Sequence, residues 1–144
     1  MRVSEILKGK GSRVVTVGPQ SSIHDLARRM KLEGIGAVVV SRDGQRVEGI
    51  VSESEIVRSL AEHGTRLLDK PVSDIMLMSV VTCTAEDSVK EVARRMTQHR
   101  VRHLPVLENG RLAGIVSIGD VVKSRLDEME LEANVLRDYI VAHQ

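Results

Sequence analysis

The chain has 144 residues, of which 42% are hydrophobic and 28% charged, the composition of a globular protein with a sizeable core. Its formal net charge is +1, from 21 basic and 20 acidic residues, and Tyr139 is the single aromatic side chain. Such balanced charge and the near absence of aromatic rings argue against binding to nucleic acid or to an anionic membrane surface.

Targeting and cysteine signals are also missing from the sequence. The N-terminal residues lack the apolar segment of a signal peptide, and no apolar run approaches the roughly 20 residues that span a bilayer. Cys83 is the only cysteine, so an internal disulfide or a cysteine-based metal cluster cannot form. We therefore expect a cytoplasmic protein that needs no metal and has no membrane partner.

The chain contains an internal repeat. Residues 27–30 and 93–96 both read Ala-Arg-Arg-Met, and residues 49–52 and 114–117 both read Gly-Ile-Val-Ser. The matching segments keep their order and nearly the same spacing, which indicates two copies of one structural unit.

Each copy begins with a short β-rich stretch and a helix. In the first copy, residues 14–17 favour a strand, and Ser22 with Asp25 predicts a capping box at the start of a helix. Apolar residues then recur at i, i+3, i+4 and i+7, which predicts one buried helix face. The second copy repeats these features at residues 80–83, Ser88 and Glu91.

Each copy continues with a hairpin and a second helix. Asp43-Gly44 and Asn109-Gly110 tolerate the positive φ angles of a tight turn, so they predict hairpins. The closing helices should begin after Ser52 and after Ser117. Each unit is therefore β-α-β-β-α, and the strands beside the turns are expected at residues 37–40, 48–51, 104–107 and 112–116.

A long helix is expected to continue to the C-terminus. Its apolar residues form a heptad stripe, which packs either on the protein's own core or against a second copy, and we favour a homodimer. The stripe consists of Leu126, Met129, Ala133, Leu136 and Ile140. We place the first unit at residues 1–58, a linker at 59–71, the second unit at 72–123 and the C-terminal helix at 124–144.

The second copy carries Arg-Val-Arg-His-Leu-Pro-Val at residues 100–106 and Gly-Ile-Val-Ser-Ile-Gly-Asp at residues 114–120. This pattern resembles the cystathionine β-synthase (CBS) motif, over residues 3–58 and 72–123. The resemblance implies an α/β fold in which two pseudo-symmetric motifs pack sheet to sheet and leave two clefts between them.

The same resemblance implies a regulatory module rather than an enzyme. Members of this family bind adenosine-containing ligands in the clefts, including AMP, ADP, ATP, S-adenosylmethionine and NAD, and they commonly form flat dimers. We expect AMP first, with ADP, ATP or NAD as alternatives. Any output should pass to a separate protein target through a change in the relative orientation of the motifs.

Ser117 and Asp120 are the first candidates for nucleotide binding. Ser-x-x-Asp is itself a capping box, so the motif has a purely structural interpretation. A helix N-terminus also attracts phosphate, and a carboxylate there can accept hydrogen bonds from ribose hydroxyls. Within the resemblance, the matching residues hold phosphate and ribose, and we favour that role for both.

A basic cluster supplies the next candidates. These candidates are Arg100, Arg102 and His103. Arg100 and Arg102 stand at the entry to a strand that, by resemblance, lines the cleft, and guanidinium groups bind phosphate bidentately. Thr82 joins them at the start of the first strand of its copy. Arg94 and Arg95 lie on the polar side of their helix, and we interpret them as structural.

The first copy departs from the pattern. Gly36 and Ala37 stand where the second copy has Arg102 and His103, and Glu55 replaces Asp120. We therefore expect a weaker second cleft that lacks the paired arginines. Its candidate residues are Thr16, Gly36, Ala37, Ser52 and Glu55.

Three alternatives belong to other functional classes. An enzyme is disfavoured because nothing resembling a nucleophile elbow surrounds Ser117. Nucleic-acid binding is disfavoured by the charge balance and the missing aromatics. A ligand-free dimerisation and interaction module remains open, since caps and turns specify the fold whether or not anything binds.

Overall fold

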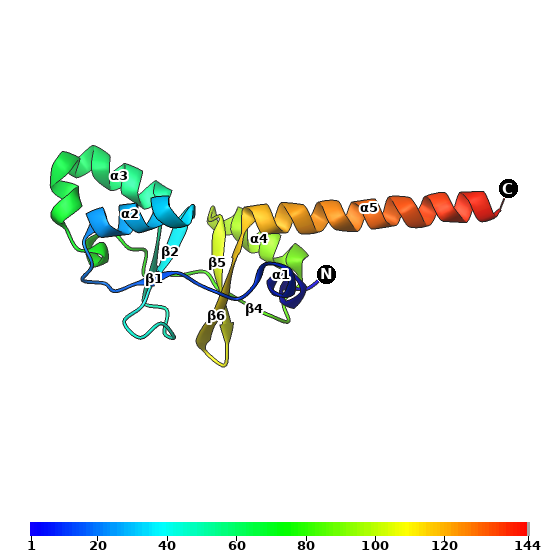
Figure 1. Ribbon diagram of the computed structural model, residues 1–144, viewed down its shortest axis with the longest axis horizontal. Helices are drawn as coiled ribbons and strands as arrows, with labels where there is room; N and C mark the ends of the chain where they lie inside the picture. Colours follow the sequence, from blue (N-terminus) through cyan, green and yellow to red (C-terminus); the bar gives the residue numbers. More distant parts are fainter. Residues whose placement is uncertain (144) are drawn as a thin grey trace.

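The computed structural model describes residues 1–143. Two three-stranded sheets lie side by side, and the long helix α5 (Ile118–Ala142) projects away from them (Figure 1). Each sheet belongs to one copy of the repeat. This arrangement confirms the predicted α/β architecture of two similar motifs with a C-terminal helix.

The first motif follows the predicted β-α-β-β-α order. Strand β1 pairs in parallel with β2, and β2 pairs antiparallel with β3, with Val38 opposite Val51. All four residues of β2 are buried, because both faces of this central strand are covered. The elements are β1 (Thr16–Val17), α2 (Ile23–Glu33), β2 (Ala37–Val40), β3 (Gly49–Ser52) and α3 (Glu53–His63).

The second motif repeats this topology. Strand β4 pairs in parallel with β5, and β5 pairs antiparallel with β6, with Leu104 opposite Val116. The first strand of each motif is shorter than the sequence suggested. The elements are β4 (Cys83–Thr84), α4 (Val89–His99), β5 (His103–Glu108) and β6 (Arg111–Ser117), followed by α5.

The two hairpin turns differ. Asn109 and Gly110 have φ angles of 53° and 77° and directly join β5 to β6, so this tight turn is confirmed. The hairpin predicted through Asp43-Gly44 is confirmed as well, since β2 and β3 pair antiparallel, but residues 41–48 form a longer connection in which only Gly44 has positive φ. There the Asp43 carboxylate instead accepts hydrogen bonds from the backbone N–H groups of Gln45 and Arg46, both at 2.9 Å.

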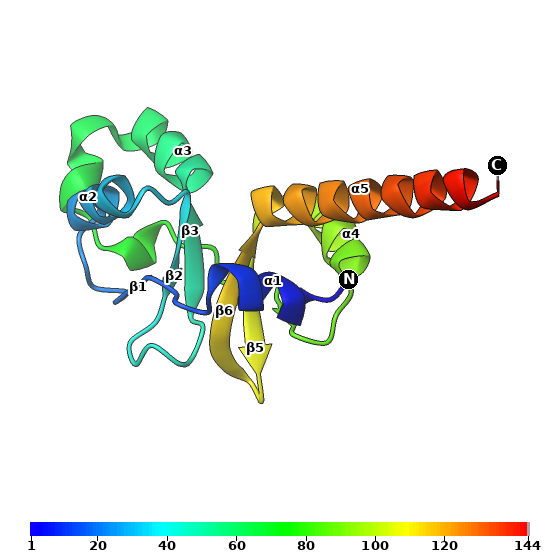
Figure 2. The same ribbon diagram turned by 45° about the vertical axis from the view of Figure 1, so that its right-hand side comes forward.

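The segment that precedes each motif packs on the other motif. Helix α1 (Val3–Lys10) contributes the fully buried Val3 to the second motif's core and lies against β6 (Figure 2). The 3₁₀ helices η1 (Gly64–Asp69) and η2 (Val72–Asp74) contribute Leu67 and Val72 to the first motif's core. Each core is therefore completed by residues that lie outside the sequence boundaries of its own motif. Helix α3 also continues beyond the boundary at residue 58, to His63.

A pair of strand glycines makes room for these segments. A Cβ built at Gly49 would lie 2.7 Å from Met76 Sδ, and one at Gly114 would lie 2.8 Å from Leu7 Cδ2. These equivalent contacts show that the repeat extends to the segments that connect the motifs.

Helix α5 is the longest element, with 25 residues. Within residues 1–143, no helix combines the length and the apolar character needed to cross a membrane. Only Val121 and Ser124 of α5 are buried, both near its N-terminal end.

Candidate functional site

A cavity of about 560 Å³ lies between the two motifs. Its wall on the first motif is the start of α3, and its wall on the second motif is the segment that joins α4 to β5. The volume is within the range of small-molecule sites in proteins. The lining residues include Gly36, Ser52, Glu53, Glu55 and Arg58 from the first motif, and His99, Arg100, Val101, Arg102 and His103 from the second.

The N-terminus of α3 forms one wall of this cavity. Ser52 donates from its backbone N–H and from its hydroxyl to Glu55 Oε1, both at 2.8 Å, and Glu55 is only 7% exposed. The N–H of Glu53 donates to the carbonyl of Gly36 at 3.1 Å, which fixes the helix start to β2. A helix N-terminus carries a partial positive charge that favours an anion, so this wall is suited to phosphate.

Three arginines line the cavity, namely Arg58, Arg100 and Arg102. In the described part of the chain, none of the three lies within ion-pair distance of a carboxylate. Guanidinium groups without a protein partner are available to bind the oxygens of a phosphate.

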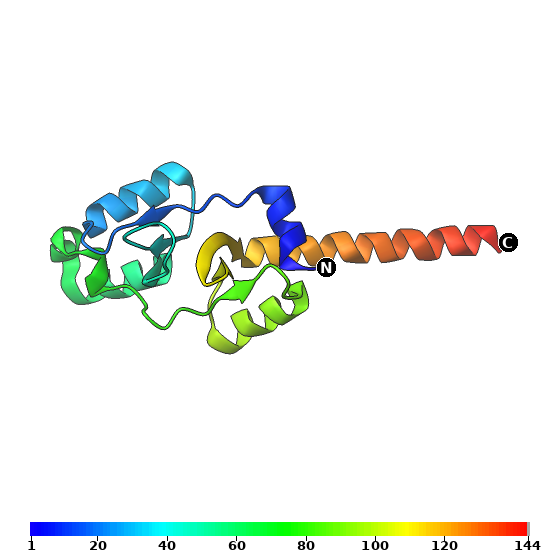
Figure 3. The same cartoon turned by 90° about the horizontal axis from the view of Figure 1, so that it is seen from below.

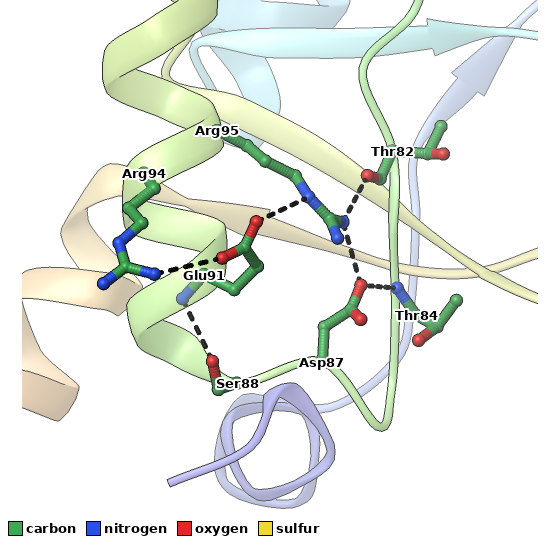
Figure 4. Close-up of polar contacts among 7 residues, drawn as sticks. All are labelled: Thr82, Thr84, Asp87, Ser88, Glu91, Arg94 and Arg95. Carbon is green, nitrogen blue, oxygen red and sulfur yellow. Dashed lines mark hydrogen bonds and ion pairs between the residues drawn. The ribbon is translucent and has the colours of Figure 1, made fainter.

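The arginines outside the cavity are different. Arg95 donates to Asp87 Oδ2 at 2.9 Å and to the Thr82 carbonyl at 3.0 Å, and Arg94 lies 3.5 Å from Glu91 Oε2 (Figure 4). The contacts of Arg95 tie α4 to the loop before it, whereas the Arg94 pair lies within α4. The predicted capping box is half formed: Ser88 Oγ accepts from the Glu91 N–H. The Glu91 carboxylate instead pairs with Arg94 and Arg95.

Arg100 has an unusual backbone conformation. Its φ is 54° and its ψ 43°, in the left-handed region, where it caps the C-terminus of α4. Gly34 occupies the same place after α2 with φ 64° and ψ 39°. A non-glycine residue there costs about 1 kcal/mol, and such strain is often found at functional sites. The second motif thus has an arginine side chain at a position that favours glycine.

His103 lies beside Gly36 at the centre of the molecule. A Cβ built at Gly36 would lie 3.2 Å from Glu53 Oε1 and 3.5 Å, an ordinary contact distance, from His103 Cε1, so the imidazole lies directly against this glycine. Burial lowers the pKa of His103, as does the charge of Lys10, whereas Asp120 and Glu53 oppose this shift. The ring is therefore held in its neutral form at pH 7.

Ser117 and Asp120 do not line this cavity. They form a complete capping box at the start of α5, in which Asp120 N–H donates to Ser117 Oγ at 3.2 Å and Ser117 N–H donates to Asp120 Oδ2 at 2.9 Å. Lys10 Nζ also lies 2.6 Å from Asp120 Oδ2. Burial raises the pKa of Asp120, but the hydrogen bonds from Lys10 and Ser117 outweigh it, and the net shift is downward.

The remaining predicted residues lie outside the cavity. Thr82 offers its carbonyl to Arg95, Thr16 pairs with Val39 in the first sheet, and Ala37 is buried opposite Ser52. Thr16 and Ala37 are sheet residues, and Thr82 directly precedes β4.

The structure corrects how we grouped the candidates. Arg100, Arg102 and His103 share the cavity with Gly36, Ser52 and Glu55, whereas the sequence analysis listed the arginines with the other cleft. The cause is the packing of the motifs, which sets the chain before β5 opposite the N-terminus of α3. Contacts between residues of different copies cannot be deduced from the sequence of either copy alone.

Sequence reasoning also missed several residues. Glu53 and Arg58 line the cavity from α3, Leu77 reaches it from the segment between η2 and β4, and Lys10 approaches Asp120 from α1. The spacing of Ser54 and Arg58, four apart after the helix start, is a signal that could have placed Arg58 on the same face. Nothing in the sequence indicates Lys10 or Leu77.

The described residues offer little for metal binding or nucleophilic chemistry. Within residues 1–143, no group of three or more His, Cys, Asp or Glu side chains could hold a metal ion. Cys83 is buried, and burial raises the pKa of its thiol to about 12. A thiol with so high a pKa is a poor nucleophile at neutral pH.

Known proteins match this architecture. The sequence model of the CBS domain matches residues 3–62 and 72–127. A CBS-domain containing protein from Agrobacterium tumefaciens is 46% identical, with a TM-score of 0.84 over 87% of this chain and 99% of its own. A CBS domain protein from Pyrobaculum aerophilum, complexed with AMP, is 33% identical, with a TM-score of 0.77 over 92% of this chain and 99% of its own.

A further solved relative carries other adenine ligands. The CBS domain pair of protein MJ0100, in complex with 5′-methylthioadenosine and S-adenosyl-L-methionine, is 25% identical. Its TM-score is 0.76, over 90% of this chain and 98% of its own.

Proposed function

The chain belongs to the CBS domain family as a tandem pair, and on this premise we propose that it is a regulatory module that binds an adenine nucleotide in the cavity between its motifs. The observation that carries the proposal is the group of three arginines without carboxylate partners, one of them in a strained backbone conformation. The AMP and S-adenosylmethionine complexes of two relatives support the ligand class.

The residues of the cavity suggest a role for each part of the ligand. Arg100 and Arg102, together with the N-terminus of α3, are placed to bind phosphate. The carboxylates of Glu53 and Glu55 are acceptors for ribose hydroxyls. The apolar side chains of the lining can cover an adenine ring, and they are Ile50, Leu77 and Val101.

AMP is the nucleotide that we propose first, with ADP, ATP and NAD as the alternatives. The module is proposed to act by binding, without turnover of the ligand. Because the cavity has one wall on each motif, a bound nucleotide favours one relative orientation of the two over others. A ligand can shift this equilibrium only by the difference between its affinities for the two orientations. The change would be read by a separate protein partner.

The experiment is a melting series on protein freed of carried-over nucleotide. Saturation at 100 times the dissociation constant adds about 2.7 kcal/mol of stability, which raises the Tm of a domain of this size by roughly 5–11 °C. We expect AMP to produce such a rise, and Arg102→Ala to reduce it strongly. Arg94→Ala is the matched control, because it removes an arginine that is paired outside the cavity.

Asp120→Ala distinguishes the cavity from the cleft that we first favoured. Asp120 caps α5 outside the cavity, so its loss should lower the Tm of the free protein and leave the AMP-induced rise intact. If Asp120→Ala abolishes the rise while Arg102→Ala does not, the ligand binds at the start of α5. If no adenine ligand raises the Tm at millimolar concentration, a ligand-free interaction module becomes the better interpretation.

A further inference from the structure

Helix α5 carries an apolar surface that the rest of the chain does not cover. The C-terminal part of the helix extends beyond every other element (Figures 1 and 3). Five of its exposed apolar side chains form a stripe, and Leu131, Val135, Tyr139 and Val141 are exposed on α5 outside it. The stripe consists of Val122, Leu126, Met129, Leu136 and Ile140, which are 50%, 60%, 58%, 59% and 49% exposed. Exposed apolar surface of this extent on one helix is characteristic of an interaction site.

The stripe has the spacing of a two-stranded coiled coil. Val122, Met129 and Leu136 fall at d positions, and Leu126, Ala133 and Ile140 fall at a positions, so that gaps of four and three residues alternate. This continuous seam, called here the α5 seam, extends for roughly 27 Å along the helix.

The α5 seam faces away from the body of the molecule. Val121 and Ser124 are buried against the body, and the N-terminal amino group of Met1 lies 3.1 Å from Glu128 Oε1 on the same side. Val122 and Leu126 lie on the opposite side of the helix and are exposed. A second helix can therefore reach the seam without displacing α1 or α4.

The charges beside the seam select the orientation of a partner helix. Arg125 and Glu132 occupy g positions, and Glu130 and Arg137 occupy e positions. In a parallel pair, a g residue meets the e residue five positions later on the other helix. Arg125 then meets Glu130 of the partner subunit, and Glu132 meets Arg137 of the partner subunit, so every such pair attracts.

An antiparallel pair overlapping along the whole seam brings like charges together. Glu130 would face Glu130 of the partner subunit, and Glu132 would face Glu132 of the partner subunit, so both pairs repel. Because the same sequence is complementary to itself only in the parallel orientation at full overlap, we propose that two copies of this chain associate through a parallel, in-register coiled coil of their α5 helices.

This proposal does not rest on nucleotide binding. The seam lies on α5 outside the cavity, and its complementary charges come from the helix alone. The dimer would bring the two bodies to the same end of the paired helices. A change of orientation within each module would then be transmitted to a common, paired C-terminal stem.

Cysteine crosslinking tests the orientation directly. In a parallel, in-register pair each d residue meets its own copy, so Leu136→Cys should form a disulfide-linked dimer under mild oxidation. Leu131→Cys is the matched control, because Leu131 is 64% exposed on the other side of the helix and should not crosslink efficiently. The parent chain should also stay uncrosslinked, since Cys83 is buried.

The result that overturns the proposal is equally specific. An antiparallel pair would leave Leu136→Cys uncrosslinked with itself, but would link it to Leu126→Cys in a mixture of the two variants. A monomer by sedimentation at micromolar concentration would also exclude the coiled coil.

Charge exchange tests the same pairs without cysteine. Glu132→Arg and Arg137→Glu should each weaken the dimer by roughly tenfold, because each turns two attractions per dimer into repulsions. The double variant should restore it, since the charges are complementary again. Neither residue makes an ion pair within the described chain, so the Tm of the body should not change. Equal weakening in the single and double variants would contradict the proposed pairing.

Discussion

Lys10 Nζ lies 2.6 Å from Asp120 Oδ2, joining the end of α1 to the start of α5 across 110 positions of sequence. The same ammonium donates to the carbonyl of Ile115 at 3.0 Å, so Lys10 is tied to β6 as well. Ser117 N–H donates to the same carboxylate oxygen at 2.9 Å. The carboxylate that the sequence pattern suggested for a ribose therefore has a structural role, holding α1 on the second motif.

We expect Lys10→Met to destabilise the protein at pH 7. Hydrogen bonding to Lys10 helps to hold the pKa of Asp120 low against the effect of burial, so the ionised pair contributes stability above the unfolded pKa of about 3.9. That contribution is lost as pH falls through the lowered folded-state pKa. Urea unfolding should show a loss of about 0.5–1 kcal/mol at pH 7 that shrinks toward pH 3.

Lys8→Met is the control for this prediction. Lys8 is an exposed lysine on the same helix, and no ion pair involves it in the described chain. If Lys10→Met is no less stable at pH 7 than Lys8→Met, the Lys10–Asp120 pair contributes nothing.

Arg100→Gly should have opposite effects on stability and on ligand binding. Glycine adopts a φ of 54° without strain, so the free protein should gain about 0.5–1 kcal/mol, or roughly 1–4 °C in Tm. The rise induced by AMP should fall, because a phosphate partner is lost. Arg102→Gly has no positive φ to relieve and should lower both quantities. A less stable Arg100→Gly would show that its backbone is not strained.

Much of the fold followed from the sequence because local signals and the repeat agree. Ser22 and Ser88 accept from the N–H groups of Asp25 and Glu91, as the helix starts predicted. The apolar period placed Leu26 and Met30 in the core. The hairpin at Asp43-Gly44 was predicted but the form of its loop was not, because the aspartate side chain organises a wider loop, an interaction that the dipeptide alone does not reveal.

The site was harder to predict, because it is assembled from both copies. Arg102 and Glu55 line the same cavity, whereas the sequence analysis assigned them to different clefts. A prediction made from one copy groups residues that are close in sequence. In the structure, the packing of the two motifs instead places the second copy's arginines against the first copy's helix. Lys10 lies outside the repeat's recognisable core, so no motif pointed to it.

His103 should make the free protein sensitive to acid. Burial first, and then Lys10 and Arg102, lower its pKa, while Asp120 and Glu53 raise it, and the net shift is downward. The histidine of the unfolded chain therefore takes up a proton near pH 6.5, whereas that of the folded chain does so only at lower pH. The free energy of unfolding therefore falls as pH drops below about 6.5.

His103→Gln should flatten the difference in unfolding free energy between pH 8 and pH 5. Glutamine keeps a polar side chain and cannot take up the proton. His99→Gln is the matched control, because it changes an exposed histidine on the same cavity. If both variants titrate like the parent, another group is responsible for the acid sensitivity.

Gly114→Ala should disturb the packing of α1 on the second motif. Its Cβ would lie 2.8 Å from Leu7 Cδ2, so the leucine must shift, at a cost of about 1–3 kcal/mol. The cost should be smaller when Leu7→Ala is already present, and a double-mutant cycle by urea unfolding measures this coupling. Gly9 lies in α1 with Leu7, and a Cβ built there would have no atom within 4 Å, so Gly9→Ala should be neutral or stabilising. Additive costs at Gly114 and Leu7 would mean that α1 does not pack on β6 in solution.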